Sequence, residues 1–369
     1  MSRREASSTV TASTARTARP RRHVEAGVQL DGHATNGAHG EGSAAASRRA
    51  LRCVQLDGLH IDTAMSWGDS GPLLFLISPC GMDALPESVW QFSGPRSGPR
   101  VLVLGGVHGN EVTGVMLVER LCADLESGAL ALAAGTLTLV VGNPRAVELG
   151  TRGSEPHADL NRSFTAKALS ANGPDTYEAR RARELAPIIA ASKLVIDLHA
   201  TNKPSDPFAI AFADTPEHRE LCSLFPCDKL LLVPDDVIGG TTAGYAEAHD
   251  SIGLCFESGW AGDLSRVEAM RVSLEAILAR VGVLDARLSA VHPQAVYALT
   301  DAVLLTDRGF AFAPSRGERS FEPFSEGDLL GIQGETELRA PYDGVLMFPK
   351  VPELWKVRSP VAFLARMQS

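Results

Sequence analysis

Short apolar runs alternate with longer amphipathic segments through most of the chain. The runs hold few polar positions, as strands with both faces covered do; they are PLLFLIS, VLVLGG, TLTLVVG, KLVIDLH, KLLLV and IGLCFE. Between them apolar residues recur at helical spacing, which predicts helices over 111–126, 175–191, 215–224 and 263–281. Strands and helices that alternate in this way are typical of an α/β fold.

Both ends of the chain depart from this alternation. Residues 1–50 are rich in Ser, Thr, Ala, Arg and Gly and hold few large apolar side chains, so we expect a disordered leader. After His292 and Pro293, short strands separated by Gly and Pro turns predict a smaller all-β domain. The expected organisation is a leader at 1–50, an α/β domain at 51–292 and a β-rich domain at 293–369.

The net charge of the chain limits the kinds of partner that it could bind. Its 369 residues carry a formal net charge of −9, and the eight Arg and four acidic residues of the first 50 leave −13 on the remainder. Nucleic acid and anionic membrane surfaces attract basic proteins, so we expect neither as a partner. No run approaches the roughly 20 apolar residues of a membrane-spanning helix. We expect a soluble protein with a small-molecule substrate, and the sequence leaves a homo-oligomer open.

The cysteines bear on the compartment. Six of them lie in predicted core elements, without a CxxC pair or the dense spacing of a disulfide scaffold. Reduced thiols favour an intracellular, cytoplasmic location. The alternative is an organelle, because the first 24 residues combine six Arg with many hydroxyl side chains and one acid, a composition shared with transit peptides.

Polar residues follow the strand in VLVLGGVHGNE, where His108 and Glu111 stand at the turn into the next helix. Their spacing lets both side chains converge on one point. Loops beyond the carboxyl ends of strands are also where open α/β sheets bind ligands. Taken alone the pair is a weak signal, since Glu111 would equally suit a plain helix start, where the helix dipole favours a negative charge.

A second strand, KLVIDLH, again ends in a histidine, His199. Two histidines and one carboxylate, with a fourth position left for water, are a recurrent catalytic zinc site. We therefore predict one zinc ion bound to His108, Glu111 and His199. For His199 alone, a hydrogen-bonded histidine of the core is the alternative.

The segment TRGSEPHADLNRSF, between these strands, is too polar for a core. Its Asn161 and Arg162 offer planar, bidentate recognition of a carboxylate. Asp159 could accept the free N–H of a ligating histidine and so fix its tautomer. His157 and Asp159 could instead be metal ligands themselves.

A single acid, Glu257, closes the run IGLCFE. A lone carboxylate at this place is either a general base or a helix cap. Beside a zinc ion the first role is favoured, because water activated by the metal needs a proton acceptor.

Five motifs follow one another along the chain: GGVHGNE, NPRAV, ADLNRSF, DLHAT and FESG. As a set, they resemble the aspartoacylase and succinylglutamate desuccinylase family, which is related to the zinc carboxypeptidases. The resemblance covers residues 70–369. It implies a zinc-carboxypeptidase-like mixed sheet flanked by helices, and a β-rich domain that narrows the entrance so that small substrates enter and proteins do not.

The same resemblance implies a reaction, the hydrolysis of a small N-acyl amino acid to a carboxylic acid and a free amino acid. His108, Glu111 and His199 would hold the zinc ion, and Asp159 would orient His108. Glu257 would be the general base and would return the proton to the leaving amine.

Substrate recognition is implied in the same way. Asn161 and Arg162 would bind the α-carboxylate. Arg152 would polarise the scissile carbonyl and stabilise the oxyanion, and such electrostatic stabilisation is often the largest single contribution to the rate enhancement of an enzyme. Aspartoacylases have a further arginine before the catalytic glutamate that reads the side-chain carboxylate. The corresponding stretch, GGTTAGYAEAHDSIGLCFE, contains none, so N-acetylaspartate is not the expected substrate.

Other residues near these motifs are open to two interpretations. Tyr245, Glu247 and His249 could shape a different pocket or lie on a solvated helix face. Tyr342 is a candidate for the second-domain tyrosine of aspartoacylases, and Trp355 lies near the region where that tyrosine is expected.

Three other functions fit the sequence less well. A carboxypeptidase-like peptidase would need an open cleft, which the β-rich domain disfavours. A non-catalytic metal- or ligand-binding relative would be free to lose Glu257 or Arg152, and both are present. The segment RAPYDGVLMFPK resembles the hairpins of biotinyl and lipoyl carrier domains, but Lys350 is not at a clear hairpin tip, so a carrier role is not expected.

Overall fold

The computed structural model describes residues 52–56, 59–63, 85–234, 237–286, 291–306 and 309–368. The chain divides into two compact units, Met1–Met82 and Asp83–Ser369. In the first unit, β1 (Arg52–Leu56) and β2 (Leu59–Thr63) pair as an antiparallel hairpin. The expected leader at 1–50 and the expected strand at 72–78 lie outside the described residues.

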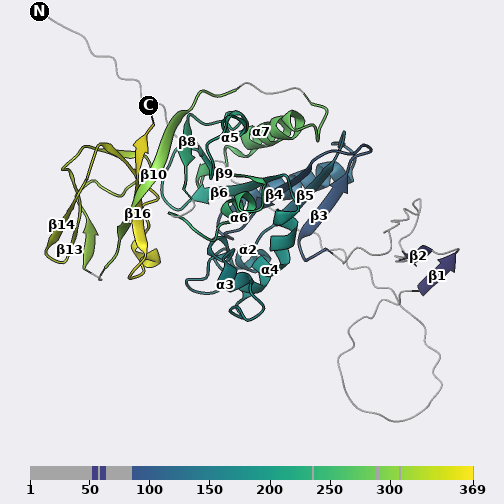
Figure 1. Cartoon of the computed structure of the whole chain (residues 1–369), viewed down its shortest axis with the longest axis horizontal. Coiled ribbons are helices and arrows are strands. Elements are labelled where there is room, and N and C mark those ends of the chain that lie inside the picture. Colours follow the sequence, from purple (N-terminus) through teal and green to yellow (C-terminus); the bar gives the residue numbers. More distant parts are fainter. Residues whose placement is uncertain are drawn as a thin grey trace, which may run out of the picture. The chain divides into compact units, whose positions relative to one another are not determined.

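The second unit is built on an eleven-stranded mixed sheet with the order β12-β15-β16-β10-β8-β7-β9-β6-β4-β5-β3 (Figure 1). Its α/β part has the strands β3 (Val89–Ser93), β4 (Arg100–Gly105), β5 (Thr136–Val141), β6 (Leu194–Thr201), β7 (Phe208–Ala211), β8 (Lys229–Leu232) and β9 (Ile252–Trp260). Its helices are α1 (Val112–Glu126), α2 (Pro144–Leu149), η1 (Leu160–Arg162), α3 (Ala166–Leu169), α4 (Tyr177–Ala190), α5 (Pro216–Cys222), α6 (Thr242–Glu247) and α7 (Val267–Arg280). The α/β class and the mixed sheet are thus confirmed.

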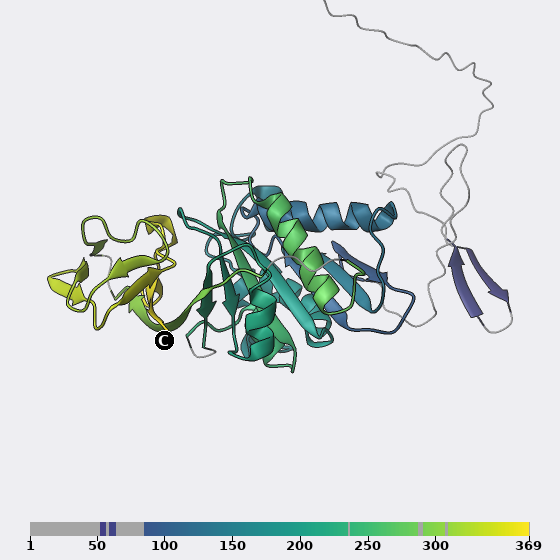
Figure 2. The same cartoon turned by 90° about the horizontal axis from the view of Figure 1, so that it is seen from above.

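The core lies on both faces of this sheet, as the continuous apolar runs predict. Successive residues of a strand point to opposite faces, so Val101 and Val103 of β4 pack with α1 and α7, while Leu102 and Leu104 pack with α4. In Figure 2, α1 and α7 lie together on one side of the sheet. The four predicted helices are confirmed as α1, α4, α5 and α7, and the predicted strands from residue 101 onward as β4, β5, β6, β8 and β9.

A smaller antiparallel region follows. Its elements are β10 (Ala295–Leu304), β11 (Phe310–Phe312), β12 (Glu322–Phe324), β13 (Leu329–Gln333), β14 (Thr336–Arg339), β15 (Gly344–Met347), η2 (Pro352–Leu354) and β16 (Pro360–Met367). Strands β11, β13 and β14 form a sheet of their own, whereas β12, β15, β16 and β10 continue the main sheet. The β-rich region is therefore hydrogen-bonded to the α/β part.

Strand β10 makes this connection. Its first residues, Ala295 to Ala298, pair in parallel with β8, and most of the strand pairs antiparallel with β16. The sequence does not predict that β10 pairs with a strand on each side, because this depends on the later strand β16 lying beside β10. Among the described residues, no helix combines the length and the apolar character needed to cross a lipid bilayer.

Candidate functional site

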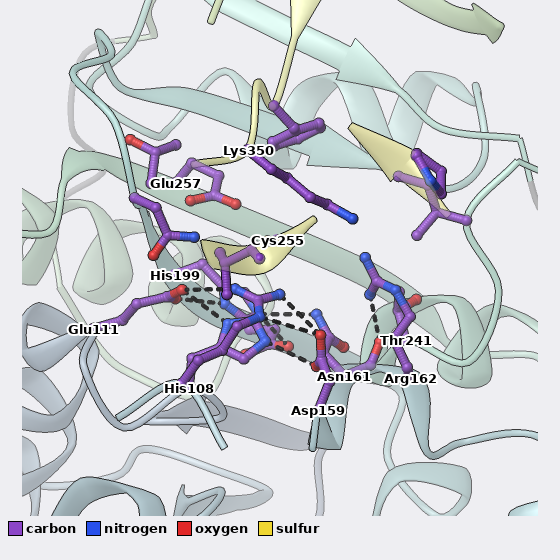
Figure 3. Close-up of a pocket in the computed structure, with 18 of the residues that line it drawn as sticks. His108, Glu111, Asp159, Asn161, Arg162, His199, Thr241, Cys255, Glu257 and Lys350 are labelled. Atoms are coloured by element: carbon purple, nitrogen blue, oxygen red, sulfur yellow. Dashed lines mark hydrogen bonds and ion pairs between the residues drawn. The ribbon is translucent and has the colours of Figure 1, made fainter. Parts of the chain in front are cut away.

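The central parallel strands bring the predicted site residues to one edge of the sheet. Strand β6 lies between β4 and β9, with Leu198 opposite Gly105 and His199 opposite Glu257. Side chains that follow such strand ends share one rim of the sheet. A cavity of about 640 Å³ opens there (Figure 3). All eight predicted site residues line it: His108, Glu111, Arg152, Asp159, Asn161, Arg162, His199 and Glu257.

The glycines of GGVHGNE allow the loop before α1 to pack tightly. A Cβ atom on Gly105 would lie 2.2 Å from the carbonyl oxygen of Gly114. One on Gly109 would lie 2.0 Å from the carbonyl group of Ala146. Larger residues at these two positions would push the loop away from α1 and α2 and move His108 with it.

The two histidines and Glu111 converge. Oxygens Oε1 and Oε2 of Glu111 lie 2.8 Å from Nδ1 of His108 and 2.8 Å from Nδ1 of His199, respectively. The candidate ligand atoms of the three residues all lie within 4.8 Å of one another. His108, Glu111 and His199 are only 3%, 2% and 3% exposed, respectively. Such a set of two nitrogens and one carboxylate could hold a metal ion.

A carboxylate stands behind each imidazole. Nε2 of His108 lies 3.0 Å from Oδ1 of Asp159, the residue expected there. Nε2 of His199 lies 2.8 Å from Oδ2 of Asp197, which sequence reasoning missed. The signal existed, because residues two apart on a strand share a face, and Asp197 precedes His199 by two positions in β6.

The charges of this cluster balance one another. Burial raises the pKa of Glu111, but the imidazoles of His108 and His199 outweigh burial and hold that pKa below its ordinary range. Burial lowers the pKa of His199, but Asp197 and Glu111 outweigh it and raise that pKa well above its ordinary value. The site therefore favours positive charge between the imidazoles and Glu111.

Arg152 is fixed by Asp159. Its Nε and Nη2 atoms donate to Oδ2 of Asp159 at 3.2 and 3.0 Å, and Nη1 lies 3.6 Å from Oε1 of Glu111. Burial raises the pKa of Asp159, but Arg152 and His108 outweigh it and hold the pKa well below the usual range. The remaining guanidinium edge of Arg152 is thereby held beside the candidate metal ligands.

Glu257 keeps one carboxylate oxygen free. Its Oε2 atom is buried and has no hydrogen-bond partner among the described residues. Burial, opposed by the charge of His199, raises the pKa of Glu257 to about 8. A free oxygen next to His199 in the sheet register can accept a proton from a group in the cavity.

Asn161 and Arg162 differ in how far the protein already occupies them. Oδ1 of Asn161 accepts the backbone N–H of Thr242 at 2.9 Å, and Nδ2 lies 3.2 Å from Nε2 of His199. The guanidinium of Arg162 donates from Nη1 to the backbone oxygen of Asn161 at 2.5 Å, its one hydrogen bond within the described part of the chain. Most donors of Arg162 are therefore available to a ligand.

Apart from His157, which lines the cavity but is not part of the group His108, Glu111 and His199, the remaining candidates from the sequence lie outside it. The side chains that do not line it are Tyr245, Glu247, His249, Tyr342 and Trp355. Tyr342 instead donates to Oδ2 of Asp301 at 2.5 Å, and Glu247 bonds to the ring of His218 at 2.6 Å. A residue not expected there, Lys350, does line the cavity.

Comparisons with known proteins found similar sequences. Residues 97–280 match the succinylglutamate desuccinylase/aspartoacylase catalytic domain. Succinylglutamate desuccinylase from Serratia proteamaculans is 30% identical over 267 residues, which are 67% of this chain and 79% of that protein. The N-acyl-aromatic-L-amino acid amidohydrolase (carboxylate-forming) of Xenopus tropicalis is 36% identical over 148 residues, or 36% of this chain, and the match spans 46% of that relative.

The fold has a counterpart among solved structures. The crystal structure of succinylglutamate desuccinylase from Vibrio cholerae superposes with a TM-score of 0.66 at 17% identity, covering 86% of this chain and 90% of that one.

Proposed function

Since the chain belongs to the succinylglutamate desuccinylase/aspartoacylase family, we propose that it hydrolyses the amide bond of a small N-acyl amino acid with one zinc ion. The observation that carries the proposal is the convergence of two imidazole Nδ1 atoms on the carboxylate of Glu111, with a carboxylate behind each ring.

The donor set fits zinc. When Nε2–H of each histidine donates to Asp159 or Asp197, the lone pair of Nδ1 is left for a metal. His108, Glu111 and His199 would then hold the ion and leave one position open. A bound zinc ion supplies Lewis-acid chemistry, polarising an amide carbonyl and making water more acidic.

Glu257 is the proposed proton carrier. Its free Oε2 atom takes a proton from the attacking water and passes it to the nitrogen of the leaving amine. Arg152 is the proposed oxyanion partner, because Asp159 fixes its guanidinium before the substrate arrives, and donors held in advance stabilise developing charge well.

Residues of the C-terminal region support a small substrate. Phe348, Pro349, Lys350 and Leu354 line the same cavity as the candidate metal ligands. They occupy space that a peptide chain would need, which disfavours a carboxypeptidase-like peptidase.

A substrate screen tests the proposal. Release of free amine is measured from a panel of N-acetyl and N-succinyl amino acids and from short peptides, with added zinc and after chelation. We expect zinc-dependent hydrolysis of at least one acylated amino acid. Cleavage of peptides alone would favour the peptidase, and no cleavage by a zinc-loaded protein would favour a non-catalytic relative.

We also propose a cytoplasmic location. Buried free thiols at Cys122, Cys222, Cys227 and Cys255 suit a reducing compartment. Imaging of the full chain and of residues 1–50 fused to a fluorescent protein tests this, and transport of the second fusion to an organelle would overturn it.

A further inference from the structure

One wall of the cavity comes from the C-terminal region. It consists of Phe348, Pro349 and Lys350, which follow β15 and are here called the C-terminal wall. The backbone of Lys350 is held at both ends, since its N–H donates to the carbonyl of Val361 at 2.8 Å and its carbonyl accepts from Nε1 of Trp355 at 2.9 Å. Figure 3 shows its side chain extending into the cavity on the side of Arg162.

The ammonium group of Lys350 has no partner among the residues that the structure describes. Within the described part of the chain, its Nζ atom makes no hydrogen bond and no ion pair. Another lysine of the same cavity, Lys203, differs, because its Nζ donates to the carbonyl of Gly317 at 2.5 Å and lies 5.7 Å from the ring centroid of Phe312. Lys350 is thus partly buried with three unused donors.

The charged neighbours of Lys350 are mostly cations. Burial lowers its pKa to about 8, and Arg162 and Arg152 add to the effect, with only Asp159 opposing it. Asp159 is already bound to Arg152 and His108. Burial also lowers the pKa of Arg162. Lys350 is half-buried and Arg162 is exposed, and Asp159 is the one anion that raises the pKa of both. Because Asp159 is already engaged, a further anion placed between the two cations would be favourable.

We propose that Lys350 and Arg162 together bind one carboxylate group of the substrate. A lysine of the C-terminal region then supplies half of a two-cation subsite, and Arg162 supplies the other half. The identity of the ligand as an N-acyl amino acid rests on the function proposed above, whereas the presence of a carboxylate subsite does not.

Apolar side chains in the lining of the cavity indicate what the ligand contains besides a carboxylate. Phe212, Ile238 and Phe348 are partly exposed and line the same cavity. Together with the two cations, they suit a ligand that has one carboxylate and an apolar portion. N-acetyl-L-phenylalanine is therefore the chosen probe, and its carboxamide is the matched ligand without the charge.

Calorimetry tests the subsite without turnover. The zinc-loaded full chain carrying Glu257→Gln is titrated with N-acetyl-L-phenylalanine and with its carboxamide. Adding Lys350→Ala should weaken binding of the carboxylate ligand about 10- to 100-fold, because a hydrogen bond to a charged group is lost. Binding of the carboxamide should change less than about twofold, and Lys350→Arg should restore most of the affinity.

Controls separate this effect from general damage. Lys356→Ala is the matched control, since Lys356 is an exposed lysine of the same cavity, and it should leave both affinities unchanged. Lys350→Gln, which keeps the length of the side chain, replaces the alanine variant if that one melts at a lower temperature. N-succinyl-L-phenylalaninamide carries its only carboxylate in the acyl group. If Lys350→Ala weakens binding of this ligand but not of N-acetyl-L-phenylalanine, the subsite is supported and binds the acyl carboxylate.

Three results would overturn the proposal. They are equal weakening of the charged and uncharged ligands, no effect of Lys350→Ala or Lys350→Gln on any of the three ligands, and no measurable binding of any carboxylate ligand. Failure of the proposed function would look different, because the wild-type protein would then release no amine from the substrate panel while calorimetry still reported carboxylate binding.

Discussion

The two sides of the cavity satisfy their charges in opposite ways. On the strand-end wall, formed by His108, Glu111 and His199, both nitrogens of each ring face a carboxylate. On the C-terminal wall, Nζ of Lys350 faces cations and has no partner among the described residues. Groups that are fully paired keep their geometry without a ligand, whereas an unpaired charge gains its partner only when a ligand binds. The first wall therefore suits the proposed chemistry, and the second suits the proposed recognition of a substrate carboxylate.

Removing a ligand from the strand-end wall should have the largest effect. His199→Ala deletes one of three proposed zinc donors, so we expect the loss of bound zinc and activity at background level. Zinc content by mass spectrometry and amine release measure this. His218→Asn is the control, because His218 is also buried but bonds to Glu247 outside the cavity. Stoichiometric zinc in His199→Ala would refute the ligand assignment.

Glu257→Gln should separate chemistry from metal binding. The variant keeps the shape of the side chain but cannot accept a proton, so kcat should fall by about 10²- to 10⁴-fold while zinc content is unchanged. Glu268→Gln, on the exposed face of α7, should retain full activity. A wild-type rate in Glu257→Gln would show that another group accepts the proton.

Asp197→Asn tests the support behind His199. The amide cannot hold the Nε2–H tautomer as the carboxylate does, so zinc affinity should fall about 10- to 100-fold. Competition with a chelator measures the affinity, and Asp214→Asn, at an exposed ion pair with Arg219, is the control. The hydroxyl of Thr242 also donates to Oδ2 of Asp197, and an unchanged zinc affinity would mean that Asp197 serves only to accept this hydrogen bond.

A pH series should show the smallest effect and distinguish the C-terminal wall. The pKa of Lys350 is lowered to about 8, so its charge is present below that pH and lost above it. KM for a carboxylate substrate should therefore rise about tenfold from about pH 7 to about pH 9. The charged groups that act on Lys350 are Arg162, Arg152 and Asp159.

The conservative variant and the uncharged ligand are the controls for this series. Lys350→Arg should give a flat KM profile, because a guanidinium stays charged throughout this range. KM for the carboxamide should be flat in both proteins. A rise that persists in Lys350→Arg would assign the titration to another group.

The sequence predicted the strand-end wall because its signals are local. Each apolar run that ends in a polar residue places that residue at a strand end, and parallel neighbours bring such ends together; His108, His199 and Glu257 follow this rule. Asp197 was overlooked inside the run KLVIDLH, although its spacing from His199 put both on one face. The short strand β7 (Phe208–Ala211) was overlooked as well, because four apolar residues carry no distinct period.

Lys350 could not have been placed from the sequence. Its position depends on the return of β16 beside β10 and on a backbone contact with Val361. Neither leaves a pattern near residue 350. The domain boundaries at 50 and 292 stay predictions, and the expected leader lies outside the described residues.

Strand β10 has a consequence for protein engineering. Because Ala295 to Ala298 are in register with β8, and a bulge between Leu299 and Asp301 separates them from most of the pairing with β16, the seam between the two regions lies inside one strand. A chimera that takes its C-terminal region from a relative should be joined at that bulge. A junction at Pro293, where the sequence pattern changes, would replace all of β10 with a strand from the relative. That strand would then have to pair with β8 of this protein, to which it is not matched.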